Sequence, residues 1–345
     1  MNNTFSPILV TGAAGFIGAA LVKALLKNGE NVIGIDNIND YYDPKLKEAR
    51  LDEIKKYSQS YSCKWHFYKI SIENKSDLLK ISEKYNFKTI VNLAAQAGVR
   101  NSIDNPSQYT SSNLVGFFNI LELCRLLKVK NFIFASSSSV YGGNENYPFE
   151  EQNTADHPLS YYGATKKANE IMAHSYSHLY DIPSTGLRFF TVYGPWGRPD
   201  MAPMLFAESM QKKKPIKVFN YGDMYRDFTY IDDVVEGIKS CCYKPAFPNN
   251  DFDSSSPDPS SSLAPFRIFN IGNCNPIKLS NFIKTLENAL GVVSIKEYIP
   301  HQLGDVKFTH SNSNKLYEWT GYRPNTSLEE GINKFALWYK NFYME

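Results

Sequence analysis

The first 190 residues alternate short runs of apolar, β-branched residues with longer segments in which apolar positions recur about every 3.6 residues. The short runs predict six strands, at 7–12, 31–36, 65–70, 89–95, 131–137 and 184–190. Helical periodicity is clearest in 16–29 and 112–128. Strands that alternate with helices favour a parallel sheet covered on both faces, as in a Rossmann-type doubly wound α/β fold. Periodicity alone does not give the order of the strands.

After about residue 190 the pattern breaks into short pieces interrupted by proline and glycine, closing with a predicted helix at 328–343. We expect a first domain formed by 1–190 with about 228–245 and 266–272, and a smaller, discontinuous α/β region formed by about 191–227 and 273–345. No interdomain linker separates them, so the second region should pack directly on the first and shape a cleft. The low-complexity segment 248–265 predicts a flexible surface loop.

Composition narrows the classes of partner. Thirty-seven Lys and Arg against 35 Asp and Glu give a net charge of +2, so no broad basic face for nucleic acid is indicated. The chain contains no run of about 20 apolar residues and no recognisable signal peptide, so we expect no membrane partner. Five cysteines without C-x-x-C spacing are typical of reduced thiols in a cytoplasmic protein.

A glycine-rich turn joins the first predicted strand to the first helix. Gly12, Gly15 and Gly18 have G-x-x-G-x-x-G spacing, which lets backbone N–H groups approach a pyrophosphate at the helix N-terminus. A plain strand–helix turn is the alternative, because a glycine triplet alone is a weak signal. Asp36 ends the second strand, where a carboxylate can bind ribose hydroxyls and repel a 2′-phosphate. Asn37 supplies no positive charge to offset it, so NAD is favoured over NADP.

The stretch "YYGATKK" at 161–167 places Tyr162 four residues before Lys166, so both project from one face of a helix. A lysine ammonium near a phenol favours the phenolate and lowers its pKa. Such a tyrosine can remove a hydroxyl proton while hydride leaves the same carbon. As a lone motif this pair is more often a surface feature, but its position after the glycine triplet and after a strand ending in serines favours catalysis.

Histidines and carboxylates show no metal-ligand spacing. His174 and His178 are four residues apart on a helix, but no third ligand lies nearby in the sequence, so no metal site is expected.

Together these motifs resemble the extended short-chain dehydrogenase/reductase family, over nearly the whole chain. The resemblance is strongest to nucleotide-sugar 4-epimerases, in particular those that act on UDP-glucuronate. The stretches that carry it are "NLAAQAGVR" (92–100), "YTSSNLVGFFNILE" (109–122), "SSSSVYGG" (136–143), "YYGATKKANE" (161–170), "RFFTVYGPWGRPDM" (188–201) and "YRDFTYIDDVV" (225–235).

The resemblance implies a set of site residues. Ser137 and Ser139 would hydrogen-bond the reacting hydroxyl, with side chains on the same side if the strand is still extended. Arg198, with Thr191 and Ser139, would bind the sugar carboxylate; a surface arginine in a proline-rich loop is the alternative. The cofactor set is Gly12, Gly15, Phe16, Ile17, Gly18, Asp36, Asn37, Leu93, Ala94, Ala95, Asn113, Tyr162 and Lys166. The UDP-sugar set adds Arg100, Val218, Phe219, Asn220, Arg226 and Asp305, of which Asp305 would either take a ribose hydroxyl or cap a helix.

The chemistry implied is oxidation at C4 of the sugar by tightly bound NAD, rotation of the 4-keto sugar, and return of hydride to its opposite face. Similar enzymes that dehydrate or decarboxylate sugar nucleotides carry acids just before "VYG", where this chain has Ser138 and Ser139. A neutral UDP-hexose or UDP-N-acetylhexosamine 4-epimerase remains the alternative within the enzyme class. An NAD-binding regulator without catalysis is the alternative outside it. The resemblance also implies a homodimer formed through two long helices, at about 106–129 and 160–180.

Overall fold

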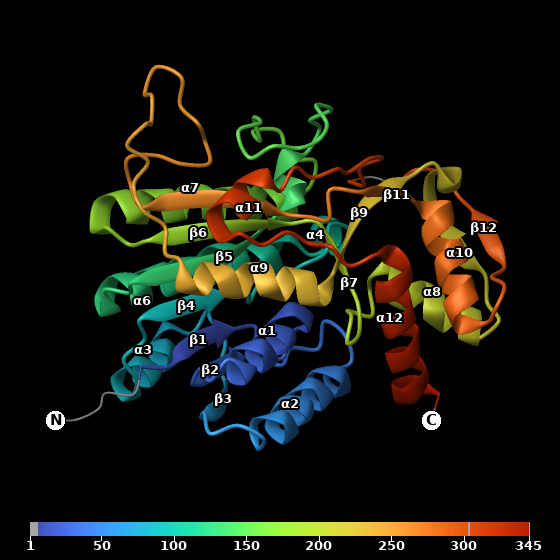
Figure 1. Cartoon of the computed structure of the whole chain (residues 1–345), viewed down its shortest axis with the longest axis horizontal. Helices are drawn as coiled ribbons and strands as arrows, with labels where there is room; N and C mark the ends of the chain where they lie inside the picture. Colours follow the sequence, from blue (N-terminus) through green and yellow to red (C-terminus); the bar gives the residue numbers. More distant parts are fainter. Residues whose placement is uncertain (1–5, 303, 345) are drawn as a thin grey trace.

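The computed structural model describes residues 6–302 and 304–344, and its main element is a seven-stranded sheet (Figure 1). All six strand pairings within it are parallel, in the order β10-β6-β5-β4-β1-β2-β3. The strands are β1 (Ile8–Thr11), β2 (Val32–Asp36), β3 (Trp65–Lys69), β4 (Thr89–Asn92), β5 (Asn131–Ser137), β6 (Ser184–Phe189) and β10 (Phe266–Ile271). The six predicted strands and the Rossmann-type fold are thereby confirmed.

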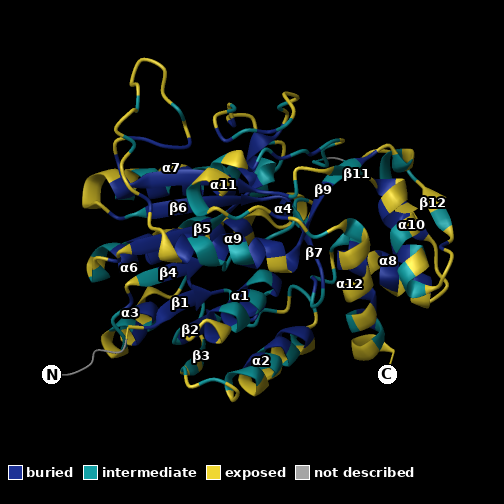
Figure 2. Ribbon diagram, viewed as in Figure 1, coloured by how far each residue is buried: buried dark blue, intermediate teal, exposed yellow. Residues whose placement is uncertain are grey.

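Helices cover both faces of this sheet, because each buries an apolar stripe against it (Figure 2). One face carries α1 (Phe16–Lys27) and α9 (Ile231–Tyr243), which pack on each other, with α2 (Pro44–Ser58) against α1. The other face carries α3 (Lys75–Lys84), α6 (Phe117–Leu127) and α7 (Tyr161–Tyr180). Three short turns lead into α6: α4 (Asn101–Asp104), α5 (Pro106–Tyr109) and the π-helical η1 (Thr110–Gly116).

The smaller region is built on a three-stranded sheet and a strand pair. The sheet has the order β11 (Pro276–Lys278), β9 (Tyr225–Tyr230), β7 (Thr191–Tyr193), and the pair is β8 (Ile216–Val218) with β12 (Lys296–Tyr298). Its helices are α8 (Ala202–Gln211), η3 (Phe219–Gly222), α10 (Leu279–Leu290), α11 (Asn314–Thr320) and α12 (Leu328–Tyr343). Only Phe190 separates β6 from β7, so one extended segment passes from the large sheet to the small one. The expected boundary near residue 228 falls inside β9, and the chain returns to the large sheet with α9.

The low-complexity segment 248–265 projects from the edge of the large sheet and is exposed over much of its length (Figure 2). Its second half is nevertheless anchored. Ser260, Ser261 and Ser262 are buried, and Lys315 Nζ donates to Asp258 Oδ2 at 2.8 Å. Flexibility of this loop stays a prediction, and it applies best to the part before residue 258.

All five cysteines carry free thiols. Cys124, Cys241 and Cys242 are buried, and burial raises the pKa of Cys241 to about 12, so these thiols stay protonated and serve packing. Within residues 6–302 and 304–344, no helix combines the length and apolar character needed to cross a bilayer.

Candidate active site

The glycine turn lies between the carboxyl ends of β1 and β4, where the strand order of the sheet reverses. Gly12 has a φ of +70°, and a Cβ there would lie 2.8 Å from the backbone nitrogen of Ala94. A Cβ on Gly18 would lie 2.0 Å from the carbonyl oxygen of Gly12. Gly15 is the N-cap of α1 and has no side chain to cap it. Backbone N–H groups in the first turn of α1 therefore remain available to an anion, as the sequence predicts.

The end of β2 presents a fixed carboxylate to the same cleft. Asp36 accepts hydrogen bonds from the backbone N–H groups of Ile38 at 2.8 Å and Ala14 at 3.2 Å. The structure adds a cation that the sequence argument did not consider. Lys47, at the start of α2, is buried and donates to the carbonyl oxygen of Asn39 at 2.8 Å. Burial lowers the pKa of Lys47, and the nearby charge of Asp36 opposes this shift.

Tyr162 and Lys166 lie on one face of α7, as predicted. Lys166 Nζ is 5.9 Å from the centroid of the Tyr162 ring and donates to the carbonyl oxygen of Ala135 at 2.9 Å. The expectation of a lowered tyrosine pKa is wrong for this structure: burial raises the pKa of Tyr162, outweighing Ser137 and the charge of Arg198, which lower it. Burial also lowers the pKa of Lys166 to about 8. Desolvation therefore dominates at both groups.

The serine run changes conformation at the point where the sheet ends. β5 ends at Ser137, and Ser138–Tyr141 forms the 3₁₀ turn η2. Ser137 Oγ accepts a hydrogen bond from the backbone N–H of Ser139 at 3.1 Å, so it caps the turn. The condition under which both serines would lie on one side, an extended strand through Ser139, is therefore not met. Both hydroxyls still line the same cavity.

A buried ion pair holds the helix that carries Tyr162 on the sheet. Glu170 lies two turns after Tyr162 on α7, and Arg188 of β6 donates to it through Nε at 2.8 Å and Nη2 at 2.9 Å. Ser136 Oγ donates to Glu170 Oε1 at 2.6 Å. This network fixes the residue just before Ser137 and the helix that carries Tyr162. Sequence patterns gave no signal for it, because its members come from three separate elements.

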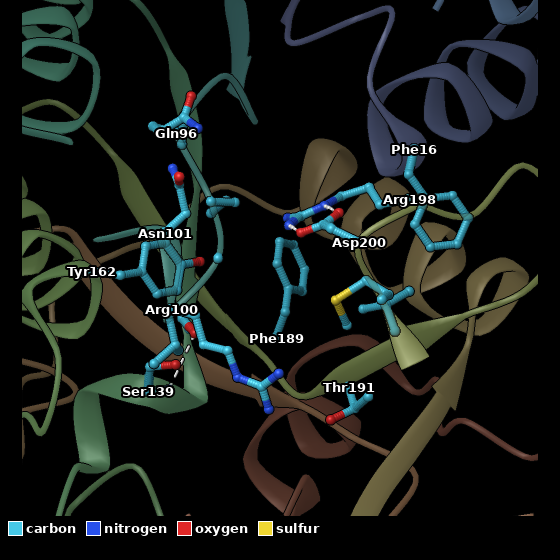
Figure 3. A pocket seen from close by; sticks show the side chains of 18 of the residues that line it. Phe16, Gln96, Arg100, Asn101, Ser139, Tyr162, Phe189, Thr191, Arg198 and Asp200 are labelled. Carbon is cyan, nitrogen blue, oxygen red and sulfur yellow. Dashed lines mark hydrogen bonds and ion pairs between the residues drawn. The ribbon is translucent and has the colours of Figure 1, made fainter. Parts of the chain in front are cut away.

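Arg198 lies in the loop after β7, and its nearest acid is Asp200. The guanidinium donates through Nε to Asp200 Oδ1 at 3.0 Å and through Nη2 to Asp200 Oδ2 at 2.5 Å. In Figure 3, Tyr162 and Ser139 lie on one side of the cavity, whereas Arg198, Asp200 and Thr191 lie on the other. No hydrogen bond among the described residues joins Arg198 to Thr191 or Ser139. These three side chains thus face one cavity from separate points.

Of the residues expected at the UDP end, Arg100 and Asp305 form an ion pair, and Arg226 lies near them. Arg100 Nη2 donates to Asp305 Oδ2 at 2.6 Å, and its guanidinium carbon lies 3.9 Å from the centroid of the Phe219 ring. Arg226 lines the cavity beside them, and burial lowers its pKa. The helix-capping alternative for Asp305 is wrong, since the next helix in the described part of the chain begins at Asn314.

One cavity of about 1040 Å³ runs from the glycine turn to Asp305. Its walls include every predicted site residue except Asn113, Val218 and Asn220. Val218 and Asn220 flank Phe219, whereas Asn113 lies behind the wall and donates to the carbonyl oxygen of Gln96 at 3.0 Å. Gln96 is itself buried and lines the cavity, and its Nε2 has no hydrogen-bond partner among the described residues. A donor of this kind suits a polar ligand, and with the glycine cradle it fits a dinucleotide.

The model of the NAD dependent epimerase/dehydratase family matches residues 8–251. The chain belongs to this family. The match covers the glycine turn, the Tyr–Lys pair and the loop that carries Arg198.

Several relatives match this chain over almost its whole length. The chain is 51% identical to "Protein CapI" of Staphylococcus aureus, over 97% of this chain and 99% of the relative. It is 43% identical to a "Probable UDP-glucuronate 4-epimerase" of Rhizobium meliloti, over 97% of each. A crystal structure of UDP-glucuronic acid 4-epimerase from Bacillus cereus, in complex with UDP-glucuronic acid and NAD, superposes with a TM-score of 0.86 at 32% identity, over 98% of this chain and 100% of that one.

Several cavity residues were not predicted from the sequence, among them Tyr41, Lys47 and Asp200. Asp200 had a usable signal, because it follows Arg198 at a distance of two residues in "GRPDM". Tyr41 and Lys47 had none, since only the fold brings the segment after β2 to the loop after β7.

Proposed function

We propose that the protein interconverts UDP-glucuronate and UDP-galacturonate by NAD-dependent 4-epimerisation through a 4-keto sugar. The observation that carries the proposal is a single cavity lined by both the Tyr–Lys pair and the glycine turn, in which Arg198 lies on the side opposite Tyr162. Relatives named or solved as UDP-glucuronate 4-epimerases support the choice of substrate.

The cofactor would lie along the large sheet. Backbone N–H groups at Gly15, Phe16 and Ile17 would bind the pyrophosphate, and Asp36 would accept the ribose hydroxyls. Leu93, Ala94 and Ala95 would form the wall after β4. NAD, when bound, accepts hydride from C4 of the sugar and later returns it. We assign cofactor binding to the large-sheet region and UDP-sugar binding to the smaller one.

Residues of this chain would transfer the proton of the reacting hydroxyl. Tyr162 would accept the proton of the C4 hydroxyl as general base, and Ser137 at the end of β5 would orient that hydroxyl. Lys166 is fixed by the carbonyl oxygen of Ala135, so its ammonium would stabilise the tyrosinate while staying in place. When hydride returns, Tyr162 would give the proton back to the same oxygen.

Arg198, together with Thr191 and Ser139, would bind the carboxylate of the sugar. A planar guanidinium suits a carboxylate because it forms paired hydrogen bonds. A 4-keto uronate is also a β-keto acid, which loses CO2 most readily when the carboxylate stands perpendicular to the carbonyl plane. We infer that these residues hold the carboxylate away from that orientation. Ser138 and Ser139 precede "VYG" in place of acids, which favours epimerisation over dehydration or decarboxylation.

The direct test is to incubate purified protein with UDP-glucuronate and to follow the product by NMR. Inversion at C4 without added NAD is the expected result. Retained configuration with CO2 release would show a decarboxylase instead. Inversion of UDP-glucose or a UDP-N-acetylhexosamine, with UDP-glucuronate unchanged, would favour the neutral-sugar alternative. No reaction with any UDP-sugar would favour a binding protein.

We further propose a homodimer formed through α6 and α7, in the cytoplasm. Large apolar side chains are exposed on these helices, including Phe118, Ile171 at 61% and Leu179 at 63%. The double variant Ile171→Lys, Leu179→Lys should sediment as a monomer, whereas the wild type should sediment as a dimer. A monomeric wild type would refute this assembly.

A further inference from the structure

We propose that Asp200 is a positioning residue that sets specificity for acid sugars: it occupies Arg198 in the absence of substrate and gives it up to the substrate carboxylate, while Tyr41 retains Asp200. This inference rests on the proposed UDP-glucuronate activity and adds a residue that the family motifs did not single out.

The first observation is that Arg198 already holds a carboxylate in paired geometry. Asp200 accepts from Nε and Nη2, which is the arrangement that a uronate carboxylate would itself adopt (Figure 3). Both partners line the cavity, and neither is sealed: their side chains are 21% and 31% exposed. An incoming carboxylate would therefore reach the guanidinium from the cavity and compete with Asp200 for it.

The second observation is that Asp200 has another donor. Tyr41 donates its hydroxyl to Asp200 Oδ2 at 3.0 Å, and the ring centroid of Tyr41 is 5.9 Å from the guanidinium carbon of Arg198. Tyr41 follows β2 on the cofactor side, 159 residues before Asp200 in the sequence. If Arg198 pairs with the substrate carboxylate instead, Asp200 keeps its hydrogen bond from Tyr41 and is not left without a partner in the protein.

The pairing keeps the charge of Arg198 balanced while no substrate is bound. An isolated guanidinium in this cavity would be poorly solvated, and it would attract phosphates or other anions without selection. Asp200 pairs with the Arg198 guanidinium within the protein. A carboxylate ligand would therefore displace Asp200 with a net gain in binding free energy only if the ligand also made the UDP and sugar contacts. The cost is lower affinity for the correct substrate, because two carboxylates compete for one guanidinium.

The test compares Asp200→Asn with Tyr41→Phe by calorimetric binding of UDP-glucuronate and of UDP-glucose. Asp200→Asn removes the competing charge at constant size, so affinity for UDP-glucuronate should rise about tenfold. Tyr41→Phe removes the donor that stabilises the released carboxylate, so affinity for UDP-glucuronate should fall about threefold. UDP-glucose has no carboxylate, and its affinity should change less than about twofold with either variant.

Opposite directions for the two variants, confined to the acid sugar, would support the exchange. Weaker binding of both sugars in both variants would overturn it, since that is what a structural role predicts; NAD content and thermal melting would show whether either variant folds. Unchanged UDP-glucuronate affinity in Tyr41→Phe would also overturn it, because Asp200 would then stay on Arg198. If the wild type epimerises UDP-glucuronate but these shifts are absent, the exchange alone fails; if it does not epimerise it, the proposed function fails.

Discussion

Two sets of cavity residues differ in how they could bind a ligand: a cofactor wall built around the glycine turn, and a substrate wall formed by two arginine–aspartate pairs. In the cofactor wall the contacts would come mainly from the backbone, and a Cβ at Gly12 or Gly18 would collide with main-chain atoms. On the substrate side they come from charged side chains that are already paired, Arg198 with Asp200 and Arg100 with Asp305. A main-chain cradle has one shape and suits a cofactor that is regenerated at every turnover. Side-chain pairs can change partner and suit a ligand that enters, turns and leaves.

The largest expected effect lies where the two walls meet. Tyr162→Phe should lower turnover of UDP-glucuronate by about 10³-fold, because the base for the C4 hydroxyl is lost. Bound NAD and affinity for UDP-glucuronate should stay close to wild type, as measured from absorbance of the purified protein and by calorimetry. Loss of bound NAD as well would show that the Tyr162 hydroxyl is needed to hold the cofactor and does not act as the base alone.

On the substrate wall, Arg198→Ala should lower kcat/KM for UDP-glucuronate by about 100-fold, because a carboxylate would be desolvated without its partner. Binding of UDP-glucose should change far less. Since Asp200 also loses its partner, the matched control is Arg198→Ala combined with Asp200→Asn. Equal losses for acid and neutral sugars, in the single and the double variant alike, would remove Arg198 from carboxylate recognition.

On the cofactor wall, Asp36→Ala should weaken NAD binding by about tenfold or more, through loss of hydrogen bonds from ribose hydroxyls to a charged group. It should also remove the stronger of the two carboxylate charges, Asp36 and Asp40, that act on Lys47, so discrimination against NADP should fall. Competition between the two dinucleotides for protein freed of its cofactor measures both effects. Asp36→Ala combined with Lys47→Met should restore the preference for NAD; failure to do so would exclude Lys47.

The lowered pKa of Lys166 should make the free energy of unfolding depend on pH. Because burial lowers its pKa in the folded protein to about 8, from 10.5, the unfolded state binds more protons between these values. The contribution of Lys166 to unfolding free energy should therefore rise with pH in this window, by at most about 1.4 kcal/mol per pH unit, and be lowest below pH 8. Urea unfolding of wild type and Lys166→Met should give a difference in unfolding free energy that grows with pH, and Lys212→Met on the exposed surface is the matched control.

The smallest expected effect concerns the outer pair. The Arg100 side chain is half-exposed although that of Asp305 is mostly covered, so the Arg100–Asp305 ion pair is partly solvated, and Asp305→Asn should change affinity for UDP by less than about fivefold. Calorimetry with UDP alone isolates this end of the cavity. A loss as large as that of Arg198→Ala for its substrate would show that Asp305 binds the nucleotide directly.

Local patterns predicted the cofactor wall well, because strand, turn and helix follow one another in the sequence there. The glycine turn, Asp36 and the Tyr–Lys pair all reach the cavity where expected. Patterns failed where distant segments meet. The pairing of Tyr41 with Asp200 joins residues 159 apart, and the buried Lys47 meets Asp36 only through the fold. The strand predicted at 131–137 ends at Ser137 as expected, but periodicity does not reveal that the Ser137 side chain then caps a 3₁₀ turn containing Ser139.

The junction between β6 and β7 has a consequence for how the sugar turns over. With only Phe190 between a strand of the large sheet and a strand of the small one, a short and continuous stretch of backbone joins the two sheets. A keto sugar must nevertheless show both faces to one fixed nicotinamide. It would do so by swinging about its own diphosphate torsions, pivoting on the uridine end. The lifetime of the ketone would then be set by the ligand's flexibility rather than by opening of the protein.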